Sequence, residues 1–144
     1  MPHRAWAPSL VLLVLATSAC GNDRERFLSG WERDGRGAPE VVVRPGEVHC
    51  EWDDALILSV AWPDASDGNA TPWHSFVRDP EGVMADYTTG SFDADAELPG
   101  DAVETGYATD GGIELWLADD LATAYLADGD DVEAWPALGG ALCA

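Results

Sequence analysis

The sequence contains no lysine, and its 7 basic residues are all arginine, whereas Asp and Glu together number 27. The formal net charge of −20 excludes a nucleic-acid-binding protein, which needs a basic surface to displace counterions from phosphates. Without lysine there is no GxxxxGKS/T phosphate loop, and neither GxGxxG nor GxSxG occurs. Hydrophobic residues nevertheless make up 47% of the chain and include 7 Trp, so the composition allows a folded core.

Cysteine and histidine are scarce as well, with three residues of each. No CxxC pair is present, and the histidines are too few for a His-rich metal site. His49 and Cys50 are adjacent, but neighbouring residues of a strand point to opposite faces, which disfavours a nucleophilic thiol. His74 precedes Ser75, and nothing nominates a third residue for a catalytic triad. The sequence therefore carries no catalytic signature.

The main uninterrupted apolar run lies near the start, over residues 10–16 (LVLLVLA), after Arg4. It is too short to span a membrane, and with the small residues that follow it predicts a secretory signal peptide over residues 1–19. Residues 17–20 (Thr-Ser-Ala-Cys) resemble the lipobox of bacterial lipoproteins, with Thr17 in place of the more usual Leu or Val. This resemblance implies that Cys20 receives a diacylglycerol. The alternative is an ordinary signal peptide that ends beside a cysteine.

The odd cysteine count leaves one thiol to explain in an exported chain, and lipidation of Cys20 accounts for it. Cys50 and Cys143 can then form a disulfide, which an exported compartment permits. Closing so long a loop would restrict the unfolded chain by about 4–5 kcal/mol in the chain-entropy model. We therefore expect a Cys50–Cys143 disulfide in preference to a catalytic thiol at Cys50.

Charge divides the mature chain into two parts. Residues 20–47 are polar and close to neutral, which is typical of a flexible tether. Residues 48–144 contain 21 acidic residues and one arginine, so this part carries the whole excess of negative charge. We expect a signal peptide over 1–19, a lipid-anchored tether over 20–47 and an acidic β-rich domain over 48–144.

Short apolar stretches separated by turn-forming clusters favour an antiparallel β meander over a helical bundle. Asp79-Pro80-Glu81-Gly82 matches a type I turn and predicts a hairpin. The predicted strands cover residues 41–43, 55–62, 73–78, 82–87, 105–107, 113–117, 121–125 and 132–135, with a short helical turn over 27–31 and a mostly loop segment over 88–101. The fold class is mainly β, a small sandwich or barrel-like meander. An α+β domain with one short helix is the alternative, since the alanine-rich residues 121–127 also suit a helix.

One acidic segment, residues 93–104, has the ligand spacing of a calcium-binding loop. Its candidate ligands are Asp93, Asp95, Glu97, Asp101 and Glu104, at EF-hand positions 1, 3, 5, 9 and 12. Leu98 stands at position 6, where the sharp turn requires glycine. The pattern argues against an EF-hand and leaves a looser divalent-cation site, with calcium as its candidate cofactor.

Trp116 is the candidate for a ligand platform. If residues 113–117 form a strand, Trp116 points away from Leu115 and Leu117, so one of the two faces is partly exposed. An exposed indole near carboxylates could stack on a sugar ring, whereas the alternative is that the tryptophans fill the core. Paired carboxylates would suit a glycan hydrolase, but among so many acidic residues no single pair is informative.

Several short motifs resemble those of exported lipoproteins from high-GC Gram-positive bacteria, a set without an assigned activity. The motifs are His49-Cys50 with Trp52, Arg78-Asp79-Pro80-Glu81-Gly82-Val83, Thr105-Gly106-Tyr107, Glu114-Leu115-Trp116-Leu117, Val132-Glu133 with Trp135-Pro136, and Cys143. The resemblance implies a place in the cell envelope and a paired Cys50 and Cys143.

The leading hypothesis from the sequence is a lipid-anchored domain on the outer face of the cell membrane that binds a partner or supports the envelope without catalysis. The alternatives are a carboxylate-using envelope glycan hydrolase and a divalent-cation-binding module. The membrane, reached through the lipid, is the one partner that the sequence names. A protein, glycan or cation partner is left open.

Overall fold

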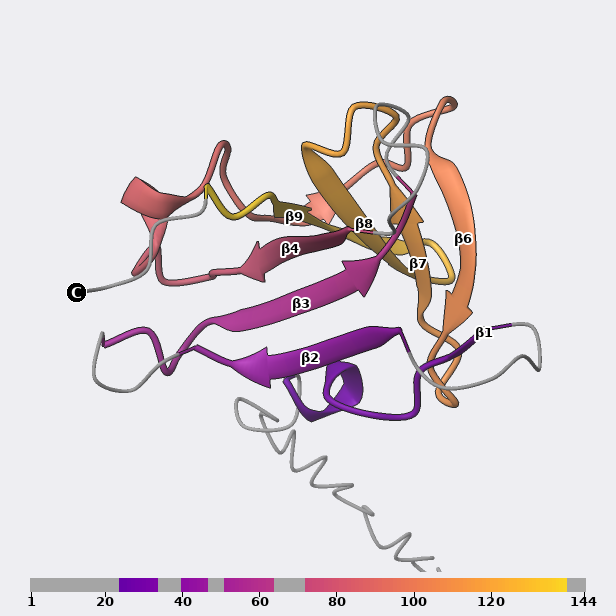
Figure 1. The fold of residues 1–144 in the computed structure, drawn as a ribbon, viewed down its shortest axis with the longest axis horizontal. Coiled ribbons are helices and arrows are strands. Elements are labelled where there is room, and N and C mark those ends of the chain that lie inside the picture. The colour runs from indigo at the N-terminus through magenta and orange to yellow at the C-terminus, as the bar shows by residue number, and fades with distance from the viewer. Residues whose placement is uncertain (1–23, 34–39, 47–50, 64–71, 140–144) are drawn as a thin grey trace, which may run out of the picture.

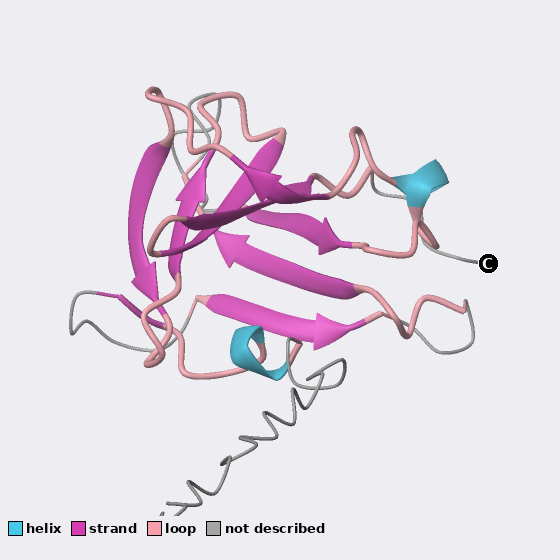
Figure 2. Cartoon of the chain, turned by 180° about the vertical axis from the view of Figure 1, so that it is seen from behind, coloured by secondary structure: helices cyan, strands magenta, loops and turns pink. Residues whose placement is uncertain are grey.

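In the computed structural model of the protein, residues 24–33, 40–46, 51–63 and 72–139 are described. They form two antiparallel sheets, one in the strand order β1-β6-β7-β8-β9-β5 and one in the order β2-β3-β4 (Figure 1). The strands are β1 (Glu32–Arg33), β2 (Val41–Pro45), β3 (Leu56–Ala61), β4 (Trp73–Arg78), β5 (Asp93–Ala96), β6 (Val103–Ala108), β7 (Glu114–Leu117), β8 (Thr123–Asp128) and β9 (Asp131–Pro136). Two short 3-10 helices accompany them, η1 (Glu25–Phe27) and η3 (Ala85–Tyr87), both cyan in Figure 2. The predicted antiparallel, mainly β fold is confirmed, with β6 to β9 as its meander.

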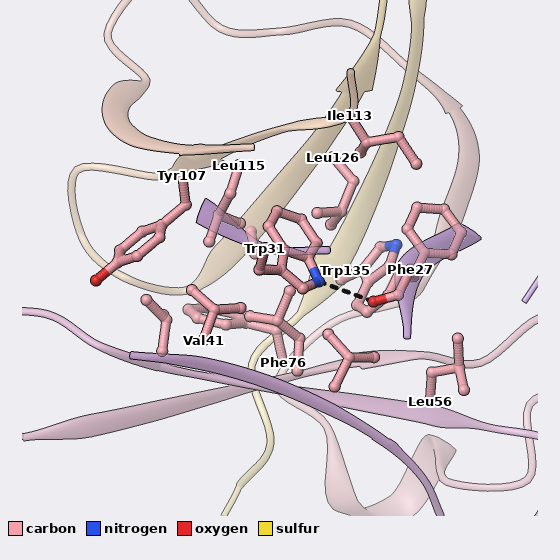
Figure 3. Close-up of a cluster of buried hydrophobic side chains, with 14 of the residues drawn as sticks. Phe27, Trp31, Val41, Leu56, Phe76, Tyr107, Ile113, Leu115, Leu126 and Trp135 are labelled. Atoms are coloured by element: carbon pink, nitrogen blue, oxygen red, sulfur yellow. Dashed lines mark hydrogen bonds between the residues drawn. The ribbon is translucent and has the colours of Figure 1, made fainter. Parts of the chain in front are cut away.

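The central strand of the small sheet, β3, is buried on both faces. Leu56, Leu58 and Val60 belong to the main core, which also contains residues of the large sheet (Figure 3). Ile57 points to the opposite face and packs in a second cluster with Trp52. Because both faces are covered, this strand needs a continuous apolar run, as its sequence predicts.

Residues 123–128 form a strand, which decides between helix and strand for the alanine-rich segment 121–127. Leu126 lies opposite Leu115 of β7, and Tyr125 lies opposite Ala134 of β9. The strand is thus paired along both edges, and these tertiary contacts override the helix propensity of its alanines.

The N-terminal segment is part of the domain. Phe27 is only 1% exposed, and Trp31, Val41 and Val43 are buried in the same core (Figure 3). The Trp31 Nε1 donates a hydrogen bond of 2.8 Å to the Phe27 carbonyl. The prediction of a flexible tether over residues 20–47 is therefore wrong for the described residues 24–33 and 40–46, whose apolar side chains cover the sheets.

A buried ion pair joins the two sheets. Arg78 of β4 donates from Nε and Nη2 to the two carboxylate oxygens of Glu133 on β9, at 2.8 and 3.2 Å. The Trp135 Nε1 donates to the same carboxylate at 2.9 Å, and Arg26 of η1 pairs with it at 3.3 Å. Each carboxylate oxygen thus accepts two hydrogen bonds, which offsets the cost of burying the charge.

The predicted turn at Asp79 is confirmed, but the prediction of a hairpin around it is wrong. The Gly82 amide donates to the Asp79 carbonyl, as the predicted turn requires. The Asp79 carboxylate then accepts from the amides of Val83 and Met84, so the chain coils into η3 instead of returning as a strand over 82–87. The neighbour of β9 at the sheet edge is instead β5, within the segment predicted to be mostly loop.

No helix among the described residues has the length and apolar character needed to cross a membrane.

Candidate ligand pocket

A hollow of about 550 Å³ opens between neighbouring ends of the two sheets. We call it the mouth pocket. Its described lining residues are Trp62, Pro63, His74, Val103, Leu117, Ala118, Asp119, Asp120 and Leu121. They come from the ends of β3, β4, β6 and β7 and from the turn between β7 and β8.

The small sheet supplies an indole and an imidazole to this pocket. His74 lies two residues before the buried Phe76 on β4, so it points to the same inner face and sits where the core ends. Its Nε2 lies 3.2 Å from the carbonyl oxygen of Trp62, which follows β3. The Trp62 amide donates to the carbonyl of Pro72 at 3.1 Å, so the residue after β3 is hydrogen-bonded to the residue before β4.

The large sheet supplies two carboxylates on a tight turn. The Leu121 amide donates to the Ala118 carbonyl at 2.9 Å, and the Ala122 amide donates to the Asp120 carboxylate at 3.0 Å. Asp119 and Asp120 are exposed at the rim. Leu121 has φ +60°, a value that few non-glycine residues adopt, and it packs against the main core.

Arg33 lies over the ring of Trp62, one of the pocket residues. Its guanidinium carbon lies 5.4 Å from the Trp62 ring centroid and 5.3 Å from that of Tyr107, within the range of cation–π attraction. The Tyr107 hydroxyl donates to Glu40 at 3.2 Å. Burial, followed by this hydrogen bond to Glu40, raises the pKa of Tyr107 above its ordinary value. The phenol is therefore neutral at ordinary pH.

A second hollow of about 370 Å³ lies on the other side of the same turn. It shares Ala118, Asp119 and Asp120 with the mouth pocket and adds Asp101 and Tyr125. The Asp119–Asp120 turn is therefore a ridge between two depressions, and it brings carboxylates into both.

The mouth pocket combines apolar surface with negative charge. Apolar side chains, among them Trp62, Leu117 and Leu121, line it, while Asp119 and Asp120 stand at its rim. Such a site suits a ligand with an apolar body and a positive charge and repels anions.

From the sequence, His74 was weighed for a catalytic triad and for a metal site, and neither Trp62 nor the Asp119–Asp120 turn was predicted as a site. These residues come from strands far apart in the chain, so no local motif unites them. The available signal was weak: an indole at the end of the predicted strand 55–62, and a pair of aspartates one residue after the predicted strand 113–117.

The candidate calcium ligands are not brought together. Asp93 and Asp95 lie on β5 at one edge of the large sheet, whereas Glu104 lies on β6 near the other edge. The strands β9, β8 and β7 stand between them, which corresponds to about 19 Å along the sheet. Glu97 and Asp101 are exposed on the connection between β5 and β6. Among the described residues, no three His, Cys, Asp or Glu side chains are grouped as a metal site would need.

Trp116 lies on the outer face of the large sheet. Leu115 and Leu117 are fully buried, whereas Trp116 is half-buried and its Nε1 donates to Glu114 at 3.3 Å. Tyr125 of β8 and Glu104 of β6 are its cross-strand neighbours. The expected partial exposure of one face is confirmed, and its use as a sugar platform stays a prediction.

Two carboxylates of the described residues are buried, those of Asp79 and Glu133, and both hold structural hydrogen bonds. Every other described Asp and Glu is exposed. A glycosidase raises the pKa of its acid by burying it in a cleft, and neither buried carboxylate lines the mouth pocket.

The predicted signal peptide, Cys20, His49, Cys50 and Cys143 lie outside the described residues. The lipid attachment and the disulfide therefore stay predictions. Comparisons with protein-family models, with curated proteins and with solved structures find no match for this chain.

Proposed function

We propose that the chain is an exported lipoprotein, anchored through a lipid on Cys20, whose β domain binds a cationic ligand with an apolar body in the mouth pocket and does not transform it. The observation that carries the binding role is the pocket itself, where Trp62 and Leu121 offer apolar surface beneath the carboxylates of Asp119 and Asp120. The signal-like N-terminus and the resemblance to exported lipoproteins support the anchor.

Charge supports the ligand class. The chain carries a formal −20, and the two rim aspartates add a local negative field at the pocket. A concave site lined by one sign of charge concentrates ligands of the other sign. A phosphate or carboxylate ligand would be repelled by the same field.

The binding test uses the mature chain with Cys20→Ser, labelled with ¹⁵N and titrated with n-butylammonium. We expect saturable chemical-shift changes at His74 and Leu121. Butyrate, which has a similar apolar body and the opposite charge, should cause none. Asp119→Asn should weaken n-butylammonium binding about fivefold, as expected for one exposed ionic contact.

Asp130→Asn is the matched control, because Asp130 is exposed on the turn between β8 and β9 and does not line the pocket. It should leave the affinity unchanged. An equal response to butyrate, or a loss of affinity that is the same in both variants, would show a diffuse effect of charge and overturn the assignment of the pocket.

The anchor is tested by the intact mass of protein extracted from membranes. We expect cleavage before Cys20 and an added acyl mass, with two hydrogens fewer than the reduced chain if Cys50 and Cys143 are paired. Cys20→Ser should move the protein to the soluble fraction. A mature chain without acyl mass would refute the anchor.

A further inference from the structure

The first described residues are tied to one end of the domain. Arg24 donates from Nη2 to the Asp53 carbonyl at 2.8 Å, and Arg26 forms an ion pair of 3.5 Å with Asp128. The next residue, Phe27, packs edge-on against Trp135 with ring centroids 5.1 Å apart. The chain is therefore held by the domain from η1 onward.

The mouth pocket lies at the opposite end. β8 begins at Thr123, next to the pocket turn, and ends at Asp128, the partner of Arg26. β3 likewise runs from the turn that contains Asp53 to Trp62 in the pocket. A six-residue strand spans about 17 Å, so the strand ends that Arg24 and Arg26 contact lie about that far from the strand ends that border the pocket. Figure 1 shows η1, in indigo, and the orange connection between β7 and β8 on opposite sides of the molecule.

The chain between Cys20 and Arg24 is short. Four residues reach about 14 Å when fully extended. Turning the mouth pocket onto the bilayer would require this leash to pass along the whole domain, including strands of about 17 Å and their turns. Exposed acidic residues occur at both ends, at Asp53 and Asp128 as well as at Asp119, so leash length, not charge, sets the orientation.

We propose that η1, the 51–55 turn and the β8–β9 turn form the membrane-facing surface of the anchored protein, and that the mouth pocket opens away from the bilayer. This inference rests on the lipid anchor of the proposed function. It assigns the pocket to ligands that arrive from outside the membrane.

The test places one fluorophore at each end of the lipidated protein. Asp130→Cys marks the β8–β9 turn and Asp119→Cys marks the pocket turn; both positions are exposed. Each labelled variant is bound to phosphatidylcholine and phosphatidylglycerol vesicles that contain a phospholipid with a nitroxide headgroup. We expect clearly stronger quenching at position 130 than at position 119. The chain without an added cysteine measures background labelling.

A longer leash tests whether the short reach of the chain between Cys20 and Arg24 sets the orientation. Twelve Gly and Ser residues inserted after Gly21 extend the reach to about 56 Å and should bring the quenching at the two positions closer together. Equal quenching with the native leash, or stronger quenching at 119, would overturn the orientation. A chain that fails to float with the vesicles would overturn the anchor and the orientation together, so the two failures are distinguishable.

Discussion

At the scale of single residues, the Glu133 carboxylate is the most heavily engaged charge of the described core. Arg78 and Trp135 donate to it, and Arg26 reaches it from η1. Arg78 and Glu133 are both less than 10% exposed. A buried pair of this kind is costly to break, because its remaining member stays in a poorly solvated place without a partner.

Glu133→Gln should lower the free energy of unfolding by about 3 kcal/mol, since it leaves the Arg78 guanidinium buried without its counter-charge. Urea denaturation of the mature chain measures the change. Asp130→Asn, an exposed substitution three residues before Glu133, should change the free energy by less than about 0.5 kcal/mol. Equal effects of the two variants would show that the ion pair contributes nothing specific.

At the scale of elements, η1 and β2 complete a core that the rest of the domain leaves open. Phe27 packs edge-on against Trp135, and Trp31 is buried in the same core, while Val41 and Val43 lie on β2, which extends the small sheet by pairing with β3. The predicted boundary between the tether (20–47) and the domain (48–144) therefore falls inside this arrangement. Charged residues indicate which parts of the chain face solvent, but they do not indicate which apolar residues are buried.

Phe27→Ala should destabilise the domain by about 3–5 kcal/mol, the usual cost of removing a fully buried aromatic side chain. Glu25→Ala, in the same 3-10 helix but exposed, should have little effect. Thermal unfolding followed by circular dichroism compares the two. A Phe27→Ala protein as stable as the parent would restore the interpretation of residues 20–47 as a tether.

At the scale of the whole molecule, acidic side chains are spread over the surface. Apart from Asp79 and Glu133, all described carboxylates are exposed, and five described arginines offset them incompletely. A net charge of this size destabilises the compact state through self-repulsion.

Added salt should therefore raise the melting temperature. Between about 0.01 M and 1 M ionic strength the Debye length falls from about 30 Å to about 3 Å, which screens repulsion between exposed groups. Melting curves in NaCl and in an equal ionic strength of KCl should rise in parallel. A melting temperature that is flat or falls with salt would show that surface repulsion is not a dominant cost.

The sequence predicted most strands because their signals are local. An unbroken apolar run marks β3, and short apolar stretches between turn residues mark the meander of β6 to β9. β5 escaped prediction because Asp93 and Asp95 resemble loop residues, and β9 alone makes this segment a strand. The Asp79 hairpin failed because the carboxylate captured two amides that a returning strand would have used.

The amino-acid sequence by itself determined the class of the fold and the sign of the surface charge, since the spacing of apolar residues and the number of charged residues are properties of the chain. Only the tertiary structure decided that Phe27 belongs to the core, that Arg26 meets Glu133 across 107 residues, and that Trp62, His74 and Asp119 share one pocket. The physical reason is that these contacts join segments whose order in space is set by sheet pairing, and pairing partners leave no mark on the local sequence of either strand.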